Sequence, residues 1–588
     1  MPINPFKCLL ISLPSTPITQ NTIDMKPLIE CVPNISEGRD IEKIKAIASV
    51  VETVEGVKLL DIDPGKSTNR TVITFVGEPE PVIEAAFRLI KKASELIDMS
   101  KHTGEHPRMG ATDVCPLVPI SGIEMSDLVS YAHRLGERVG KELNIPGYFY
   151  ETAANQPKRK NLAYCRQGEY EGLDKLSTEA GKPDFGPAEF NASVKKTGAT
   201  AISVRDFLVA YNVNLNTTSP RRANAIAFDI REAGRVKKEG NSLTGKVVLD
   251  QNGEPERVPG SLKAVKGIGW YIEEYGIAQL SLNLTNISIT PVHIAFDEAC
   301  KKAQERGIRV TGSEIVGLVP LKCLIDAADY FLKKQERSLG ISEPEKIKIA
   351  VKSLGLDDLA PFDPEKKVIE YLIRDHSQKR LIDMNLTQFA DEAASESTAP
   401  GGGSVSAYCG VLGISMGTMV ANISAHKRGW DDRWEHFSEW AQKGEAIKNQ
   451  LLAAVDEDTE AFKMIMDAFG LPKDKPEEIT ARKKAIADAT RHAAQVPLKV
   501  AQITEKAFDV IEAMVREGNQ NSITDGGVGA LCARTAVKGA VMNVRINLKG
   551  FEDTEFVETT LKEAARLDKM AEEREKTITD LVSSKLGV

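Results

Sequence analysis

The stretch TVITFVGEPEPVIEAAFRLIKKASELI, residues 71–97, joins a β-rich run directly to a helix-forming run. Its first part, TVITFV, is rich in β-branched residues, which is typical of a buried strand. Its second part repeats apolar residues at helical spacing, which predicts a helix over residues 81–97. The neighbouring sequence continues the alternation, with KLLDID, CPLVPI and GYFY as strands and SDLVSYAHRLGERVGKEL as a helix. We therefore expect a β/α unit in this part of the chain.

The alternation restarts after about Thr197 and builds a second unit. FLVAYNVNL and AQLSLNL are typical of strands, and RRANAIAFDIREAG and HIAFDEACKKAQERGI are typical of helices. Between them, NSLTGKVVLDQNGEPERVPG carries turn residues at QNGEP and predicts an inserted hairpin. Two consecutive units of similar size predict two lobes, with a cleft between them as the default ligand site.

The last third of the chain loses this alternation. Beyond Leu386 no convincing strand appears, and alanine-rich segments around residues 435–469 and 479–514 predict long helices. The predicted fold class is an α+β two-lobed N-terminal half, with two β/α subdomains and a cleft, followed by an all-α helical-bundle domain. The expected boundaries are a disordered extension at 1–24, the two subdomains at 25–203 and 204–352, a linker at 353–385 and the helical domain at 386–588.

Composition excludes several classes of protein. The net charge of −8, from 76 basic and 84 acidic residues in 588, argues against nucleic acid as the main partner. The eight cysteines lie far apart without a CxxC pair, and the histidines do not cluster with them, so we expect no metal site. Isolated cysteines and a proline-interrupted N-terminal apolar run without a cleavage pattern predict a cytoplasmic protein.

One apolar segment, SVSAYCGVLGISMGTMVANIS at residues 404–424, raises the question of a membrane span. It contains serines and an asparagine, and small residues recur at Gly410, Gly413 and Gly417. Such a helix packs closely against other helices in a bundle core as readily as in lipid. Because no membrane signals flank it, we expect a core helix and no membrane partner.

Two polar residues of the first unit are candidates for catalysis. His106 lies in GEHPRMGATD, residues 104–113, where a proline stiffens the loop and glycines permit close approach of a ligand. An imidazole moves protons near neutral pH, although a lone histidine is more often structural. Asp63 ends the strand-like KLLDID, where functional carboxylates occur, but it is as well explained as a turn-initiating residue.

The helical domain offers two further candidates. APGGGS, residues 399–404, places Gly401, Gly402 and Gly403 before a long helix, where backbone N–H groups suit a carboxylate or phosphate. A flexible turn explains the same residues. Asp456 and Asp458 in LLAAVDEDTEAF are two positions apart, so only one can face inward. An inward carboxylate in a bundle has a raised pKa and can act as an acid or base, while a solvated acidic face is the plainer alternative.

Several strings of the N-terminal half together resemble the glutamate formiminotransferases. They run along most of residues 27–350: ECVPNISEGRD, LLDIDPGKSTNRTVITFVGEP, LIDMSKHTGEHPRMGATDVCPLVPI, GEYEGL, PDFGP and VGLVPLKCLIDAADYF. From about Leu386 to Leu548, TAPGGGSVSA, DEDTEAF and AVMNVRINL resemble the cyclodeaminase half of the formiminotransferase-cyclodeaminases. The same helical family also contains methenyltetrahydrofolate cyclohydrolases.

The resemblance implies a bifunctional folate enzyme of histidine degradation. A formimino group passes from N-formiminoglutamate to tetrahydrofolate, a co-substrate that we expect to be polyglutamylated, and ring closure then expels ammonia. It implies that His106 is the acid–base group and that Asp63 orients either His106 or the formimino donor. It also implies that Asp458 is the active-site aspartate of the cyclodeaminase half. The folate-contacting segment corresponds to Gly186, Pro187 and onward to Gly198.

Other inferences from the resemblance concern the folate tail, assembly and the second reaction. The glycine-rich helix start, or Lys427 and Arg428 in SAHKRGW, could hold tail carboxylates, although surface solubility also explains the basic pair. The family suggests a homo-oligomer. GNQNSITDGGVGA is closer to the cyclohydrolase branch, so a cyclohydrolase, or an inactive dimerisation domain, stays an alternative for the helical half.

Overall fold

The chain divides into two units, residues 1–208 and 209–588. The structure is a computed structural model, and it describes residues 27–66, 68–104, 107–240, 245–251, 253–374 and 380–587. The expected extension at 1–24 and the candidate His106 lie outside these ranges.

The N-terminal unit is built on a mixed sheet. Within its described residues the strand order is β1-β4-β2-β5-β7-β6, with β3 paired to β4. The pairs β5–β7 and β6–β7 are parallel, and the other pairs are antiparallel. The strands are β1 (Leu28–Cys31), β2 (Asn34–Ile35), β3 (Val57–Gly65), β4 (Arg70–Gly77), β5 (Thr112–Ser121), β6 (Gly147–Glu151) and β7 (Thr200–Val204).

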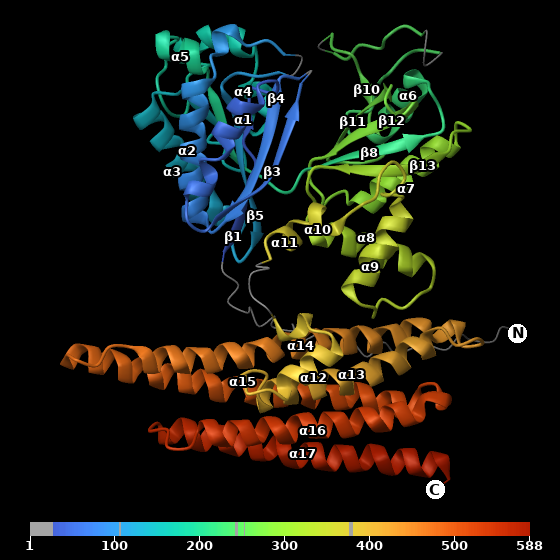
Figure 1. The fold of residues 1–588 in the computed structure, drawn as a ribbon. Helices are drawn as coiled ribbons and strands as arrows, with labels where there is room; N and C mark the ends of the chain where they lie inside the picture. Colours follow the sequence, from blue (N-terminus) through green and yellow to red (C-terminus); the bar gives the residue numbers. More distant parts are fainter. Residues whose placement is uncertain are drawn as a thin grey trace, which may run out of the picture. The chain divides into compact units, whose positions relative to one another are not determined.

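Helices cover both faces of this sheet. The main core joins the strands to three helices that Figure 1 shows along one side of the sheet, and a smaller core on the other face joins β6 and β7 to shorter helical segments. Along β5, Cys115 and Leu117 enter the main core while Val114 enters the smaller one, as the alternation of side chains along a strand requires. The main helices are α1 (Ile41–Ala48), α2 (Pro79–Leu96) and α3 (Met125–Leu143); the shorter ones are α4 (Leu162–Cys165), η4 (Tyr170–Ser177) and α5 (Ala192–Thr197).

The second α/β subdomain has an antiparallel sheet in the order β11-β12-β8-β13. One core joins this sheet to its helices. The predicted hairpin is present as the short pair β9–β10 and two isolated bridges, although residues 241–244 and 252 lie outside the described chain. The elements are β8 (Val209–Leu215), α6 (Pro220–Ile230), β9 (Arg235–Val236), β10 (Arg257–Val258), β11 (Val265–Ile272), β12 (Ile277–Leu284), α7 (Val292–Gln304), β13 (Val310–Val316), α8 (Leu321–Lys334) and α9 (Glu343–Leu354).

The linker expected at 353–385 is shorter in the structure. Residues up to Leu372 belong to the second α/β subdomain: they form α10 (Pro364–Lys367) and α11 (Ile369–Leu372), and Val368 and Tyr371 enter its core. Pro364 begins α10, where its missing backbone donor costs no hydrogen bond within the helix, so the prolines of this stretch do not mark the end of the domain.

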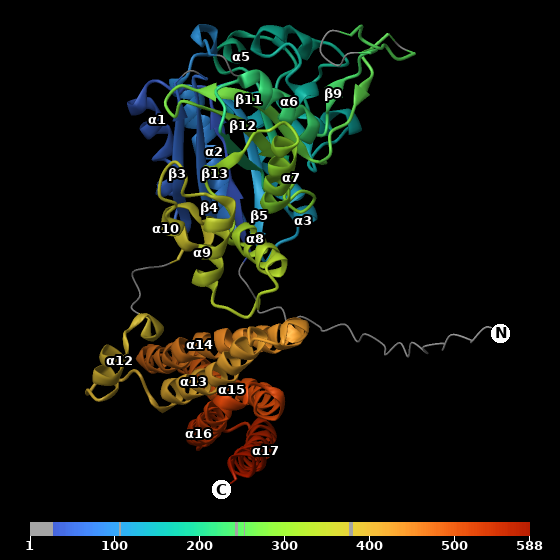
Figure 2. The ribbon, with the colours of Figure 1, turned by 90° about the vertical axis from the view of Figure 1, so that its right-hand side faces the viewer.

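The helical domain confirms the all-α prediction. From Leu386 onward the described residues contain helices and no strand. Figures 1 and 2 show the long helices α13 to α17 side by side, with the short α12 beside them. The helices are α12 (Leu386–Ala393), α13 (Gly402–Ala425), α14 (Trp434–Gly470), α15 (Pro476–Glu517), α16 (Ile523–Asn547) and α17 (Thr554–Leu586).

Close packing of α13 follows from its glycines, as predicted. A Cβ at Gly413 would lie 2.8 Å from the carbonyl oxygen of Gly529 on α16, and one at Gly417 would lie 3.1 Å from Ile511 on α15. By length and apolar composition α13 could cross a membrane, and 61% of its apolar window is buried inside the protein. Burial against α14, α15 and α16 is what the core helix of a bundle requires.

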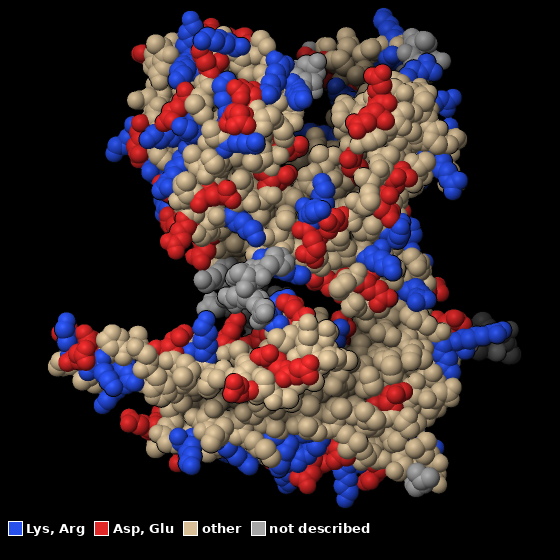
Figure 3. Space-filling model, viewed as in Figure 1, with Lys and Arg blue, Asp and Glu red and all other residues tan. Residues whose placement is uncertain are grey.

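Charge is unevenly spread over the helical domain. Figure 3 shows few charged side chains over the middle of the face of this domain that it displays. The helices α13 and α16 expose large apolar side chains at Val405, Leu412, Ile423, Val528, Leu531, Met542 and Ile546. Exposed apolar groups gathered on two adjacent helices are typical of an interaction surface.

Candidate active sites

Three loops of the N-terminal unit meet at one end of its sheet. The buried Asn69 joins them: its Oδ1 accepts from the backbone N–H of Gly38 at 3.0 Å, and its Nδ2 donates to the carbonyl of Thr103 at 2.8 Å. Ser36 Oγ also donates to the carbonyl of Gly110 at 2.8 Å. The loop that carries His106 is therefore anchored on both sides of the residues that the structure leaves out.

The structure brings the turn after Asp63 close to the residues just before His106. Asp63 is exposed near the end of β3, and the turn that follows it reaches Thr68. A Cβ at Gly104 would lie 2.4 Å from the carbonyl oxygen of Thr68, so the segment just before His106 packs directly on that turn. Contact between the two side chains stays a prediction.

A buried carboxylate beneath this loop pairs with two arginines. Asp113 is fully buried, and its Oδ2 accepts from both Arg70 and Arg166 while its Oδ1 accepts from the N–H of Met109 at 3.0 Å. Burial lowers the pKa of Arg70 below its usual value, and the Asp113 charge opposes that effect. Two guanidinium groups on one carboxylate leave an excess positive charge, which favours an anionic ligand nearby.

His102, four residues before His106, has a structural role. Its Nε2 lies 2.9 Å from the carbonyl oxygen of Asn69, and Arg108 Nε donates to its Nδ1 at 3.3 Å. Because Nδ1 accepts, the ring is neutral, and burial lowers the pKa of His102. Arg108 is held in turn by Glu171 at 2.7 Å. This network orients the loop.

The predicted folate segment touches the loop at one of its ends. Gly198 has φ of 68°, and a Cβ there would lie 2.2 Å from the carbonyl oxygen of Met109. Gly186, with φ of 77°, lies instead against Ile145 before β6, and Pro187 beside it is half-buried. The structure therefore places Gly198 beside the candidate site and Gly186 at the other end of the segment.

In the helical domain, Asp458 lines a cavity of about 200 Å³ between the start of α13 and the helices α14, α15 and α16. Its Oδ2 accepts from the backbone N–H of Ser404 at 2.8 Å and from the Ser404 hydroxyl at 3.1 Å. At the start of α13, the backbone N–H of Ser404 is thus bound by the protein's own Asp458 carboxylate. Burial raises the pKa of Asp458, and the bonds from Ser404 oppose that rise. The other polar lining residues are Thr398, Thr459, Asn543 and Asn547.

Asp456 faces a different part of the domain. Its Oδ1 accepts from the backbone N–H of Leu381 at 2.7 Å, so it anchors the entry to the helical domain on α14. Burial raises its pKa as well. Only Asp458 of the pair lines the cavity, which supports its selection as the candidate for catalysis.

The three glycines before α13 have different roles. A Cβ at Gly403 would lie 2.0 Å from Asp458 Oδ1, whereas one at Gly401 would meet nothing within 4 Å. Gly402 is intermediate, with Asn543 Nδ2 3.4 Å from its Cβ position. Close approach of Asp458 therefore requires glycine at 403 and does not require it at 401. Folate binding by these residues stays a prediction.

We expect Gly403→Ala to lower the activity of this site by about 100-fold, because the added methyl group displaces the Asp458 carboxylate by about an ångström. Gly401→Ala is the matched comparison, and it should cost far less activity because a Cβ there meets nothing within 4 Å. Steady-state rates of the two purified variants check this, and equal rates would contradict the geometry.

Lys427 and Arg428 lie at the far end of α13 from these glycines. The helix has 24 residues, which corresponds to roughly 36 Å at about 1.5 Å per residue. Lys427 Nζ lies 4.0 Å from the centroid of the Trp430 ring, and Arg428 is exposed. Within one chain this basic pair is therefore separate from the Asp458 cavity.

Two residues of this cavity were not predicted as site residues from the sequence. Asn543 and Asn547 lie one turn apart on α16, and both line the cavity. Two asparagines four positions apart, and so on one face of a helix, are the sequence signal that could have indicated them.

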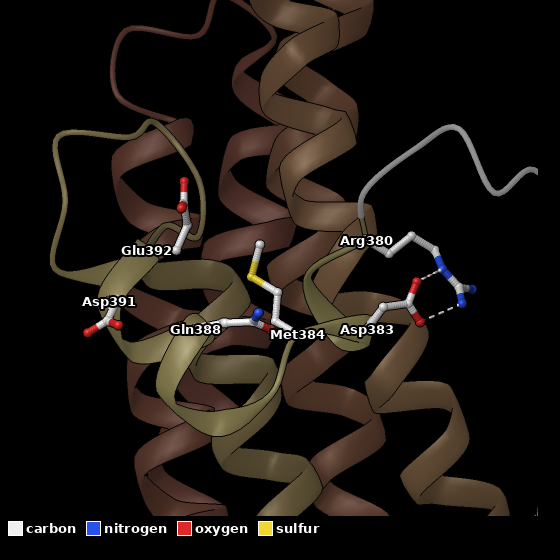
Figure 4. A pocket seen from close by; sticks show the side chains of 6 residues that line it. All are labelled: Arg380, Asp383, Met384, Gln388, Asp391 and Glu392. Atoms are coloured by element: carbon white, nitrogen blue, oxygen red, sulfur yellow. Dashed lines mark hydrogen bonds and ion pairs between the residues drawn. The ribbon is translucent and has the colours of Figure 1, made fainter.

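A second cavity of the helical domain lies beside α12. Its lining residues are Arg380, Asp383, Met384, Gln388, Asp391 and Glu392. Figure 4 shows Arg380 and Asp383 paired with each other, while Asp391 and Glu392 point in different directions. The side chains do not converge on one point, so this cavity does not compete with the Asp458 site. Within the described residues, no group of three His, Cys, Asp or Glu side chains could hold a metal ion.

The fold and the two sites define a fusion of a two-subdomain α/β enzyme with a helical enzyme. Residues 28–205 match the family "Formiminotransferase domain, N-terminal subdomain", residues 210–374 match "Formiminotransferase domain", and residues 385–566 match "Formiminotransferase-cyclodeaminase".

Curated relatives cover the same parts of the chain. Formimidoyltransferase-cyclodeaminase of Mus musculus is 43% identical over 538 residues, which are 91% of this chain and 95% of the relative. Glutamate formimidoyltransferase of Streptococcus pyogenes serotype M1 is 40% identical over 53% of this chain and 95% of its own. Methenyltetrahydrofolate cyclohydrolase of Methylorubrum extorquens is 34% identical over 34% of this chain and 96% of its own. The chain belongs to the formimidoyltransferase-cyclodeaminase family, which confirms the resemblance in both halves.

Proposed function

We propose that this chain transfers the formimino group of N-formiminoglutamate to nitrogen 5 of tetrahydrofolate, and then closes the ring to 5,10-methenyltetrahydrofolate with release of ammonia. Both activities are in the names of its relatives. The observation that carries the second step is the half-buried Asp458 in a cavity, held by Ser404 at the start of α13. A carboxyl with a raised pKa suits acid–base catalysis near neutral pH.

In the first reaction, nitrogen 5 attacks the formimino carbon, and the bond from that carbon to the glutamate nitrogen breaks. His106 takes the proton from nitrogen 5 and returns it to the glutamate nitrogen, so glutamate leaves neutral at that atom. Asp63 orients His106 or the donor. The excess positive charge around Asp113 supports substrate binding near this loop, because both substrates carry carboxylates.

In the second reaction, nitrogen 10 attacks the carbon of the protonated formimino group and gives up its proton to Asp458. The protonated Asp458 then donates to the amino group as the carbon–nitrogen bond breaks, and ammonia leaves. One bond forms, one bond breaks and the carboxylate is regenerated. Because the Oδ2 of Asp458 accepts from Ser404, its Oδ1 is the oxygen placed to exchange the proton.

We expect ammonia release to fall on the acidic side at a pH above the ordinary pKa of an aspartate. Burial raises the pKa of Asp458, and the base must be ionised to accept a proton. As the pH falls through this raised value, Asp458 becomes protonated and the rate declines. A pH profile of ammonia release from supplied 5-formiminotetrahydrofolate measures this limb. A rate that stays constant down to the ordinary aspartate range would contradict the assignment.

The second candidate for the helical half is a methenyltetrahydrofolate cyclohydrolase, which the Methylorubrum extorquens relative favours. Supplied 5,10-methenyltetrahydrofolate without ammonia separates the two. A cyclodeaminase leaves the methenyl absorbance at its uncatalysed rate of decay, whereas a cyclohydrolase speeds that decay. We expect no acceleration by the wild-type protein.

Other parts of the proposal concern the folate tail, assembly and location. A polyglutamylated tail suits a chain with two folate sites, because a bound tail keeps the intermediate at high effective concentration. Lys427 and Arg428 are its candidate contacts, and the KM values for mono- and polyglutamylated folate test this.

The exposed apolar side chains on α13 and α16 support a homo-oligomer, which light scattering checks. A cytoplasmic location is supported by the widely spaced cysteines, which include no CxxC pair.

A further inference from the structure

Two carboxamides face the cavity of Asp458 with their orientation set by the backbone. Asn543 Nδ2 donates to the carbonyl of Gly539 at 2.9 Å, and Asn547 Nδ2 donates to the carbonyl of Ala493 at 2.6 Å. A flipped amide would place its oxygen against a carbonyl oxygen, so each NH₂ group stays on the carbonyl side. Among the described residues, neither Oδ1 atom has a hydrogen-bond partner, and both residues line the cavity.

Asn543 and Asp458 lie beside two successive glycines at the start of α13. A Cβ at Gly402 would lie 3.6 Å from Asn543 Oδ1, while one at Gly403 would lie 2.0 Å from Asp458 Oδ1. The charged or amide groups of the described lining are therefore one carboxylate and two carboxamides, without lysine or arginine. With these three acceptor groups and no cationic side chain in its described lining, the cavity favours a ligand rich in N–H donors and positive charge.

The substrate of the proposed second reaction has such a group. A protonated formimino group presents N–H donors on a delocalised cation, and its amino group keeps these donors until it leaves as ammonia. We propose that Asn543 and Asn547 bind this nitrogen through their Oδ1 atoms. They thereby select a substrate with a departing amine over an analogue that carries an oxygen atom at the same position. The inference rests on the proposed cyclodeaminase function. A 5-formyl group would set its acceptor oxygen against the amide oxygens, and the site rejects it for that reason.

The test compares substrate and oxygen analogue on the full-length chain. In Asn543→Leu and Asn547→Leu, which keep side-chain size but lose the acceptor, kcat/KM for ammonia release from 5-formiminotetrahydrofolate should fall about 100-fold. The inhibition constant of 5-formyltetrahydrofolate should stay unchanged or improve. A parallel loss of kcat/KM and of 5-formyltetrahydrofolate binding would mean that the asparagines only shape the cavity. An unchanged kcat/KM would mean that they do not bind the nitrogen. Either result overturns the inference.

Two controls separate binding from folding. Asn543→Ser can still donate to the Gly539 carbonyl one turn back, but its shorter side chain withdraws the acceptor, so it should lose activity as Asn543→Leu does. Asn449→Ser, at an exposed position of α14, should keep full activity. An Asn543→Ser variant that melts like the wild type and releases ammonia equally fast would overturn the inference. A wild type that releases no ammonia would instead remove the proposed function, and this inference with it.

Discussion

We expect Asp458→Asn to lower ammonia release steeply and to leave formimino transfer intact. The asparagine keeps an oxygen that accepts from Ser404, so the start of α13 retains its hydrogen bond. It cannot carry the proton from nitrogen 10 to the departing amine, and removal of a general acid–base group lowers a rate by about 10³-fold. Parallel measurement of glutamate and ammonia from N-formiminoglutamate checks both halves in one experiment.

The same variant should also raise the melting temperature of the helical domain at neutral pH. Burial raises the pKa of Asp458 in the folded state above its value in the unfolded state. The folded protein therefore binds the proton more tightly, and the contribution of Asp458 to stability falls as pH rises through the interval between the two values. At neutral pH the ionised form opposes folding, and a neutral amide removes that effect. Loss of both activities together with a lowered melting temperature would show that Asp458 has a structural role.

His106→Asn should produce the opposite pattern. Without the imidazole no group returns the proton to the glutamate nitrogen, and formimino transfer should fall by about 10³-fold. Ammonia release from supplied 5-formiminotetrahydrofolate should be unchanged, because the Asp458 site belongs to a different unit of the chain. Glutamate release, followed with excess tetrahydrofolate, measures the loss.

A matched control for this variant is His133→Asn. His133 lies on α3, where its Nε2 is 2.9 Å from the carbonyl oxygen of Ala153, and it takes no part in the loop network. It should keep transfer activity. If His106→Asn transferred the formimino group as fast as His133→Asn, the assignment of His106 would be wrong.

Much of the fold could be predicted because its signal is local. The β-branched run at 71–76 and the apolar spacing at 81–97 correspond to β4 and α2, and each follows from the period of its own residues. The end of the second α/β subdomain could not be placed this way. Prolines and charges near residue 360 resemble a linker, yet Val368 and Tyr371 are buried by contacts with residues distant in sequence.

The candidate sites also contain residues that the sequence could indicate and residues that only the folded chain brings together. Asp458 was selected through a resemblance, and the sequence alone left Asp456 equally suitable; only the folded positions of Leu381 and Ser404 separate them. Asn543 and Asn547 escaped notice because they come to Asp458 from a helix far along the chain.

The central claim is that one chain performs both transfer and deaminating ring closure. The most direct test supplies purified wild-type protein with N-formiminoglutamate and tetrahydrofolate, and follows glutamate, ammonia and the methenyl absorbance together. The account predicts that all three products rise in equal amounts. Glutamate formed without ammonia or methenyl product would contradict it, and would leave the helical half without cyclodeaminase activity.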